Sequence, residues 1–291
     1  MWEVGGYIGS HVTSALIESG EKVIVVDSLI TGHIDAVHPD AKVFLGDLKD
    51  SEFLEKVFKE NEISGVIDFA AFSLVGESMM EPLKYFENNF YGTLCLIKMM
   101  QKYNVKNIVF SSTAATYGEP ENIPILETDK TFPTNPYGES KLAVEKLLKW
   151  CDKAYGIKYT ALRYFNVAGA HPNGNIGEDH NPESHLIPII LQVALGKREN
   201  ISVFGNDYPT EDGTCIRDYI HVMDLAQAHI LALKRLENGG DSSIFNLGNG
   251  EGFSVLDVIK VARKVTNHPL LSSPVSFHPQ DRKSTRLNSS H

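Results

Sequence analysis

The chain has 291 residues, of which 42% are hydrophobic and 22% charged, and its formal net charge is −10. This composition is that of a globular protein and excludes disordered, collagen-like and disulfide-stapled classes. The acidic balance disfavours binding to nucleic acids or anionic membranes, and no apolar run approaches the ~20 residues of a membrane span. Because the chain starts without a signal-peptide pattern and its three cysteines are widely spaced, we expect a cytoplasmic protein.

Short β-branched runs alternate with amphipathic, helix-length stretches through the first part of the chain, which is the pattern of repeated βαβ units. The runs are apolar throughout, as strands covered on both faces should be. The pattern predicts an α/β fold with a doubly wound, Rossmann-like parallel sheet. The expected strands are 22–26, 42–45, 65–69, 107–110 and 159–162, and the expected helices are 7–19, 51–60, 82–103 and 136–155.

The amino-acid composition changes after Asn166, where Gly, Pro, Asn and His become frequent. We therefore expect a first domain at 1–165 and a smaller α/β substrate-binding lobe at 166–280. The lobe would hold strands at 201–204 and 219–222, a helix at 224–236 and a strand–loop–helix unit at 244–266. Only Met1–Val4 precede the first glycine, so the first strand is expected to be missing or vestigial. The hydrophobic residues of 281–291 follow neither the helical nor the strand period, so this segment is expected to be a non-native tail.

A glycine cluster opens the first predicted helix, with Gly5, Gly6 and Gly9 around Tyr7 and Ile8. Glycines at this place let a pyrophosphate approach the backbone where helical N–H groups point outward. The next strand ends at an acidic residue eighteen positions after Gly9, near the ~20 typical of a carboxylate that binds an adenosine ribose. That residue, Asp27, favours NAD over NADP. The glycine cluster by itself is also compatible with an ordinary turn before a helix.

Tyr137 and Lys141 form a Tyr-x-x-x-Lys pair on a predicted helix, so that both side chains lie on one face. A tyrosine of ordinary pKa near ~10 needs a nearby cation before it can act as a base at neutral pH. The alternative for this pair is a solvated surface contact.

A run of hydroxyl residues, Ser111–Ser112–Thr113, follows an apolar strand. Ligands gather at the carboxyl ends of parallel strands, so a hydroxyl there can bond to a reacting oxygen. Strand-end turn chemistry is the alternative, because Ser and Thr also favour turns.

Taken together in their order along the chain, these motifs resemble those of the UDP-glucose 4-epimerases, a family of extended short-chain dehydrogenases/reductases. The similarity runs from about Gly5 to about His278. Its most family-specific part is the stretch 204–222. The segments that carry it are Gly-Tyr-Ile-Gly-Ser-His at 6–11, Phe-Ser-Ser-Thr-Ala-Ala-Thr-Tyr-Gly at 110–118, Tyr-Gly-Glu-Ser-Lys at 137–141, and the segments 163–170 and 204–214.

The resemblance implies reversible epimerisation at C4 of UDP-glucose and UDP-galactose with a tightly bound NAD. Tyr137 would take the proton of the sugar 4-OH while hydride leaves C4, and the resulting 4-keto sugar would turn over before hydride returns to its opposite face. Lys141 would lower the pKa of Tyr137 and bind the nicotinamide ribose. Thr113 would belong to the same hydrogen-bond network.

The resemblance also assigns binding residues. The cofactor would contact Gly6, Tyr7, Ile8, Gly9, Asp27, Asp47, Leu48, Phe69, Ala70, Asn89, Tyr137, Lys141 and Phe165. The nucleotide-sugar would contact Thr113, Asn166, His185, Leu186, Phe204 near the uracil and Arg217 on the diphosphate. The guanidinium of Arg217 matches phosphate oxygens physically, whereas Asn166 as a loop cap and Phe204 as a core aromatic are the alternatives.

Two departures from the family pattern concern the ends of the chain. Glu3 takes the place of the first glycine of the motif, which puts a carboxylate near the expected phosphates. From Pro279 onward, nothing resembles the Arg-Arg-x-Gly-Asp segment with which the family also holds the nucleotide-sugar. We therefore expect a chain truncated at both ends, and an inactive fragment is one alternative function.

Three further expectations complete the sequence-based hypothesis. A nucleotide-sugar dehydratase would need an acidic pair after the strand-end hydroxyl, where this chain has Ala114 and Ala115, so epimerisation is favoured. Glu178, Asp179, His180 and His185 resemble a metal-ligand cluster, but they lack a short ligand pair on a rigid element, so we expect no metal. The family implies a homodimer through the helices at 82–103 and 136–155, and Tyr103, Trp150 and Tyr155 are expected to serve packing or that interface.

Overall fold

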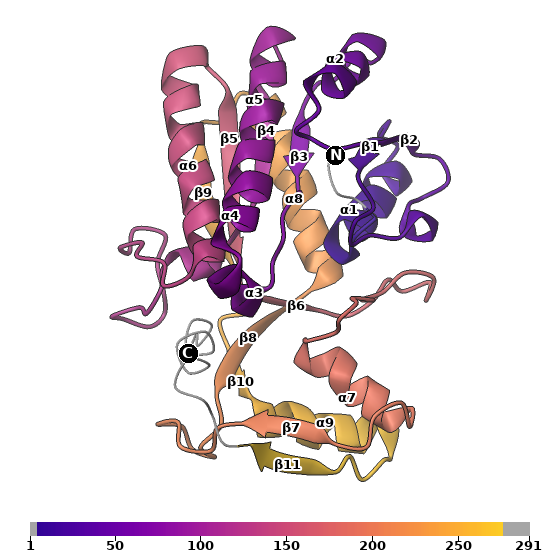
Figure 1. Cartoon of the computed structure of the whole chain (residues 1–291), viewed down its shortest axis with the longest axis vertical. Coiled ribbons are helices and arrows are strands. Elements are labelled where there is room, and N and C mark those ends of the chain that lie inside the picture. Colours follow the sequence, from indigo (N-terminus) through magenta and orange to yellow (C-terminus); the bar gives the residue numbers. More distant parts are fainter. Residues whose placement is uncertain (1–4, 276–291) are drawn as a thin grey trace.

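The computed structural model describes residues 5–275 (Figure 1). The expectations for Met1–Val4, for Glu3, for the segment from Pro279 and for the tail at 281–291 lie outside these residues. The larger part of the described chain is built on parallel strands. β1 (Ile24–Asp27) pairs with β2 (Lys42–Leu45), and β3 (Val66–Asp68), β4 (Asn107–Thr113), β5 (Lys158–Tyr164) and β9 (Ser243–Leu247) pair in that order.

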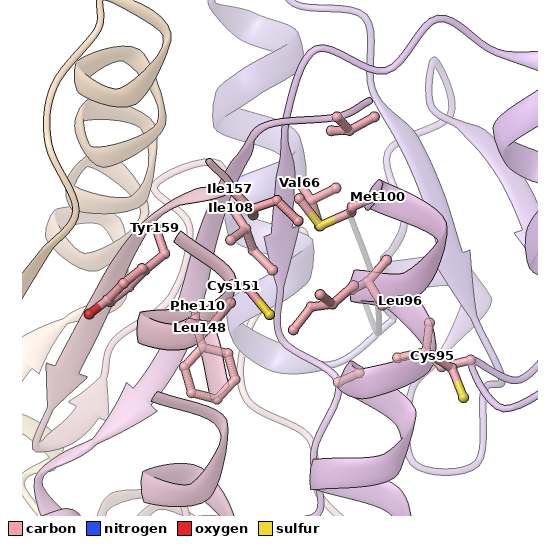
Figure 2. Packing of buried hydrophobic residues seen from close by; sticks show 14 of the residues in the cluster. Val66, Cys95, Leu96, Met100, Ile108, Phe110, Leu148, Cys151, Ile157 and Tyr159 are labelled. Atoms are coloured by element: carbon pink, nitrogen blue, oxygen red, sulfur yellow. The ribbon is translucent and has the colours of Figure 1, made fainter. Parts of the chain in front are cut away.

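Helices cover both faces of these strands, which confirms the predicted doubly wound α/β fold. One face carries α2 (Ser51–Glu60), α5 (Thr93–Lys102) and α6 (Pro136–Tyr155), and the other carries α1 (Tyr7–Glu18) and α8 (Val222–Glu237). Figure 2 shows side chains of α5 and α6, among them Leu96, Met100 and Leu148, directed toward Ile108 and Phe110 of β4. Burying this apolar surface is the main favourable contribution to folding.

The predicted helix at 82–103 is a continuous run of three pieces. It begins with α4 (Pro82–Tyr85) after the short α3 (Val75–Met80), passes through the π-helix η2 (Phe86–Gly92), and continues as α5. π-Helical turns of this kind occur mostly as local insertions in α-helices and often at functional sites. Here the π-helix carries Asn89, one of the predicted cofactor residues.

The expected division of the chain at residue 165 is wrong for two elements. β9 pairs with β5 in the larger sheet, with Ala161 opposite Ile244, and α8 packs its buried Ala226 and Ile230 against Val109 and Leu162. The chain thus returns to the first domain after it has entered the smaller lobe. Strand order depends on pairing between distant segments, and a local hydrophobic pattern carries no information about it.

The smaller lobe contains two short sheets and two helices, drawn below the larger domain in Figure 1. β10 (Gly252–Ser254), β8 (Ile216–His221) and β6 (Asn166–Ala168) form one sheet, and β7 (Ile201–Phe204) pairs in parallel with β11 (Ser272–Val275). A separate apolar cluster lies between α7 (Leu186–Ala194) and α9 (Val255–Thr266) and includes Ile190 and Ile259. None of the described helices is long and apolar enough to cross a membrane.

A cavity of about 110 Å³ lies between β1 and β3. Its lining comes from both strands, from α1 and α8 on one face of the sheet and from α2 on the other. The cavity therefore separates the β1–β2 pair from β3 among the described strands.

Candidate active site

The glycine loop opens α1 and lies against the carboxyl end of β1. Gly6 is the N-cap of α1, in extended conformation and without a side-chain cap, and the space around its missing side chain is open to 4 Å. Asp27 is buried and accepts hydrogen bonds from the backbone N–H groups of Gly5 and Leu29, each at 2.6 Å. The carboxylate thus holds the loop against the strand end, and the helix N-terminus is open to an anion.

Four of the predicted cofactor residues meet at one hollow. Asp27, Asp47, Leu48 and Ala70 line it, from the ends of β1, β2 and β3. A carboxylate for a ribose hydroxyl and apolar side chains for a purine face are the groups that the adenosine half of a dinucleotide requires. The residues present therefore fit NAD.

Tyr137 and Lys141 lie in the first turns of α6, which begins where the sequence requires. Asn135 caps the helix by accepting from the N–H of Gly138 at 2.8 Å, and Pro136 occupies the first turn. The Lys141 ammonium is buried and donates to the carbonyl oxygen of Ser111 at 2.7 Å. A solvated surface pair is therefore excluded for Lys141.

Thr113 is the last residue of β4, and its hydroxyl faces Tyr137. Burial raises the pKa of Tyr137, and the hydrogen bond to Thr113 opposes that rise. The Thr113 side chain also accepts from the N–H of Ala115 at 3.1 Å, capping a short 3₁₀ turn. The hydroxyl therefore serves both the strand-end turn and the predicted network. The sequence predicts that Lys141 lowers the pKa of Tyr137. In the structure the effect of burial is larger, so the pKa of Tyr137 is raised.

A buried ion pair beneath this site was missed by the sequence reasoning. Glu145 of α6 accepts from Arg163 of β5 at 2.9 Å and 2.5 Å, and from the hydroxyl of Ser112 at 2.5 Å. Both charged side chains are 4% exposed. Glu145 lies one turn after Lys141 on the same helix face, and that spacing was the available signal. The pair fixes α6 to β4 and β5.

The remaining predicted cofactor residues surround the strand ends. Phe69 is half-buried, and its ring lies 4.9 Å from that of His229. Asn89 is buried, and its amide bonds to the backbone of Phe72 and to the hydroxyl of Ser140. It thereby ties the π-helix to the first turn of α6. Phe165 is half-buried directly after β5.

Three of the predicted substrate residues, Asn166, Phe204 and Arg217, lie on strands of the smaller lobe. Asn166 begins β6 and donates to the carbonyl oxygen of Asp218 at 3.1 Å, which brings it beside Arg217 on β8. Asp218 is itself buried and accepts from two backbone N–H groups of the loop after β9. Phe204, at the end of β7, is 53% exposed, so the alternative of a core aromatic is wrong.

Tyr7 links the glycine loop to the smaller lobe. Its hydroxyl donates to the carbonyl oxygen of Gly169 at 2.6 Å, and its ring edge meets that of His180. His180 lies in the loop that precedes α7 and ends at His185, the N-cap of that helix, next to Leu186. Glu178 and Glu183 of the same loop contact both histidines. The predicted residues His185 and Leu186 are therefore held by a polar cluster.

Comparison with known proteins gives one result throughout. The model of the NAD dependent epimerase/dehydratase family matches residues 4–248. A UDP-glucose 4-epimerase of Halalkalibacterium halodurans is 61% identical over 265 residues, which are 91% of this chain and 79% of that protein. The chain belongs to the UDP-glucose 4-epimerase family. The sequence resemblance is thereby confirmed.

Solved structures of UDP-glucose 4-epimerases have the same fold. The Brucella ovis enzyme in complex with NAD superposes with a TM-score of 0.92 at 38% identity, covering 100% of this chain and 92% of that one. The Bifidobacterium longum enzyme in complex with NAD⁺ and UDP gives 0.89 at 37% identity, again covering 100% and 92%. These UDP-glucose 4-epimerases thus share both lobes of the structure described here.

Proposed function

We propose that this chain is an isomerase that interconverts UDP-glucose and UDP-galactose by epimerisation at C4, through a 4-keto sugar and with NAD as its resident cofactor. One observation carries the proposal. Tyr137, Thr113 and Lys141 converge at the carboxyl end of β4, and a hollow lined by residues predicted for adenosine lies at the carboxyl ends of β1, β2 and β3. Membership of the UDP-glucose 4-epimerase family supports the same reaction.

The chemistry divides between the cofactor and the side chains. Bound NAD⁺ supplies a reversible hydride acceptor for C4 of the sugar. Tyr137 takes the proton of the 4-OH and later returns it, and Thr113 holds the reacting oxygen in line with the phenol. Lys141 holds positive charge one helical turn from Tyr137, which favours the phenolate against the effect of burial.

The binding residues follow the resemblance. Gly6, Tyr7, Ile8 and Gly9 would hold the pyrophosphate at the start of α1, with Asp27 on the ribose, and Asp47, Leu48, Phe69, Ala70, Asn89 and Phe165 along the rest of the cofactor. Arg217 and Asn166 lie on the paired strands β8 and β6, with Asn166 opposite Tyr219 and two positions along from Arg217, which supports a shared role at the diphosphate. The exposure of Phe204 supports stacking on the uracil. His185 and Leu186 would complete this pocket from α7.

The dehydratase alternative is not favoured. Ala114 and Ala115 follow Thr113 and are buried in the 3₁₀ turn. A dehydratase needs an acid beside the reacting sugar to expel water, and alanine has no proton to give.

The test is conversion of UDP-galactose to UDP-glucose by the purified chain supplied with NAD⁺, for wild type, Tyr137→Phe and Tyr155→Phe. Tyr155, at the end of the same helix, is 46% exposed and far from the site in sequence. We expect turnover in wild type and Tyr155→Phe, and a loss of about 10²- to 10⁴-fold in Tyr137→Phe. Turnover that survives in Tyr137→Phe would contradict the proposed base, and absence of turnover in wild type would support an inactive fragment.

We also propose a cytoplasmic homodimer that binds neither nucleic acid nor membrane. α4, η2 and α6 carry exposed apolar side chains, of which Leu83 is 82% and Trp150 65% exposed. Exposed large apolar side chains on neighbouring helices are typical of interfaces. The three cysteines are free and buried, in accord with a reducing compartment.

A further inference from the structure

We propose that Glu178, His180, Glu183 and His185 form a binding site for one divalent transition-metal ion of the zinc type, which clamps the loop before α7. The cluster shares His185 with the proposed nucleotide-sugar pocket, but metal binding can be tested without the proposed reaction. Each residue offers one ligand atom, and the four atoms lie within 4.8 Å of one another. The proposal revises the expectation of no metal, because the loop folds so that the ligand atoms of its two Glu-x-His units face one another.

The four carboxylate–histidine distances in the cluster are close to the ligand separations of a metal site, and the largest separation among the four ligand atoms is within 4.8 Å. Oε1 of Glu178 lies 3.3 Å from Nδ1 of His180 and 3.0 Å from Nδ1 of His185. Glu183 presents one oxygen at 3.7 Å to His180 and the other at 2.9 Å to His185. Ligands held about 2.0–2.2 Å from a zinc ion are about 3.4 Å apart in tetrahedral geometry. Both imidazoles therefore turn their Nδ1 atoms toward the carboxylates of Glu178 and Glu183.

Burial gives a second, independent observation. The side chains of Glu178 and Glu183 are 8% and 4% exposed, so two carboxylates are nearly removed from water within a few ångströms of each other. Buried anions require a cation. Nδ1 of His180 is buried as well and faces both carboxylates, at 3.3 Å from Glu178 and 3.7 Å from Glu183.

The position of the cluster gives the metal a structural role. His180 contacts the ring of Tyr7 at the start of α1, and His185 is the N-cap of α7. A bound ion would therefore tie together the glycine loop, the loop at 178–185 and the first helix of the smaller lobe. Four protein ligands leave no open coordination position, as in structural rather than catalytic zinc sites.

The experiment measures metal binding directly, without reference to turnover. The full chain is stripped with a chelator and titrated at pH 7.5 with Zn²⁺ by calorimetry, and with Co²⁺ by visible absorption. We expect one ion per chain, the intense visible bands of tetrahedral Co²⁺, and an unfolding midpoint that rises with Zn²⁺ concentration, since a ligand of the folded state stabilises it. Glu178→Gln and His180→Asn should each weaken Zn²⁺ binding by at least about tenfold.

A matched control lies within the same loop. Asp179 stands between two of the ligands in sequence but pairs at 3.6 Å with His33, and both side chains are largely exposed. Asp179→Asn and His33→Asn should bind Zn²⁺ like wild type. Each variant is also melted in chelator, so that loss of fold is separated from loss of binding. Binding below one equivalent, a weak octahedral Co²⁺ spectrum, or equal affinities in ligand and control variants would overturn the site and leave only a cluster of histidines in contact with carboxylates.

Discussion

A Cβ atom built on Gly138 would lie 2.7 Å from the carbonyl oxygen of Ala115. The first turn of α6 therefore touches the backbone of the turn after β4, and this contact sets Tyr137 beside Thr113. Only glycine allows the approach, because a methyl group would meet a fixed carbonyl rather than a flexible side chain.

Gly138→Ala adds only one methyl group, but it should lower the catalytic rate strongly. A shift of Tyr137 by about 1 Å can cost about 10²-fold in rate, and overpacking costs about 1–3 kcal/mol of stability. Epimerase kcat and the urea midpoint measure both effects. Gly76→Ala is the control, since Gly76 also lies in a helix but its Cβ would meet nothing within 4 Å. Wild-type kcat in Gly138→Ala would refute the steric argument.

The second prediction concerns the pH dependence of activity. Burial raises the pKa of Tyr137, and the base must be deprotonated, so kcat/KM should rise with pH through the pKa of that group. Lys141→Met removes the neighbouring cation and should move this limb to higher pH. Activity at neutral pH should then fall about tenfold for every pH unit by which the limb moves. Lys141→Arg, which keeps the charge, should restore part of the wild-type profile. A limb that stays in place in Lys141→Met would assign Lys141 to binding alone.

Removal of either partner of the buried Glu145–Arg163 pair should lower the stability of the protein strongly. Glu145→Gln leaves the Arg163 charge without its partner inside the protein and should cost about 3–5 kcal/mol. Replacing both residues with Gln and Met should recover part of that loss. Urea unfolding provides the measurement. Glu121→Gln is the control, because Glu121 and Lys130 form a pair 3.6 Å apart on the surface, and its midpoint should equal that of wild type.

His229 predicts loss of stability in mild acid. Burial lowers its pKa from 6.5 to about 4, in contact with Phe69 and Tyr164. Between pH 6.5 and about 4, His229 is protonated in the unfolded chain but stays neutral in the folded chain. The free energy of unfolding therefore falls as the pH decreases toward 4, by about 3 kcal/mol in all.

His229→Gln does not titrate and should remove most of that slope. Urea unfolding at pH 7.5 and pH 5 compares the two proteins. An equal fall in wild type and variant would assign the acid sensitivity to other groups.

The proposed dimer predicts a single-site effect on assembly. Leu83→Glu and Trp150→Glu place charges on the exposed face of α4 and α6 and should convert a dimer to a monomer in sedimentation at micromolar concentration. Leu195→Glu, another exposed leucine (70% exposed) but on the smaller lobe, should sediment like wild type. A wild-type chain that sediments as a monomer would refute the dimer.

Most local elements of the larger domain could be predicted because their signals are short in range. The expected helices at 51–60 and 136–155 have the observed bounds of α2 and α6, and the expected strand at 42–45 is β2. Apolar runs, caps such as Asn135 and the helical spacing of Tyr137 and Lys141 act within a few residues. The family motifs were readable for the same reason.

Tertiary structure alone decided which elements belong together. Nothing near Ile244 or Ala226 indicates that β9 and α8 return to the first sheet, because that depends on pairing with β5 across some eighty residues. Likewise the two Glu-x-His units become one cluster only when the loop folds back on itself. The sequence by itself determined the helices, strands and motifs from local periodicity, because those signals act within a few residues. The burial of Glu145 with Arg163 was decided by the packing of α6 on β5, and the contact of Glu178 with His185 by the way one loop folds back on itself.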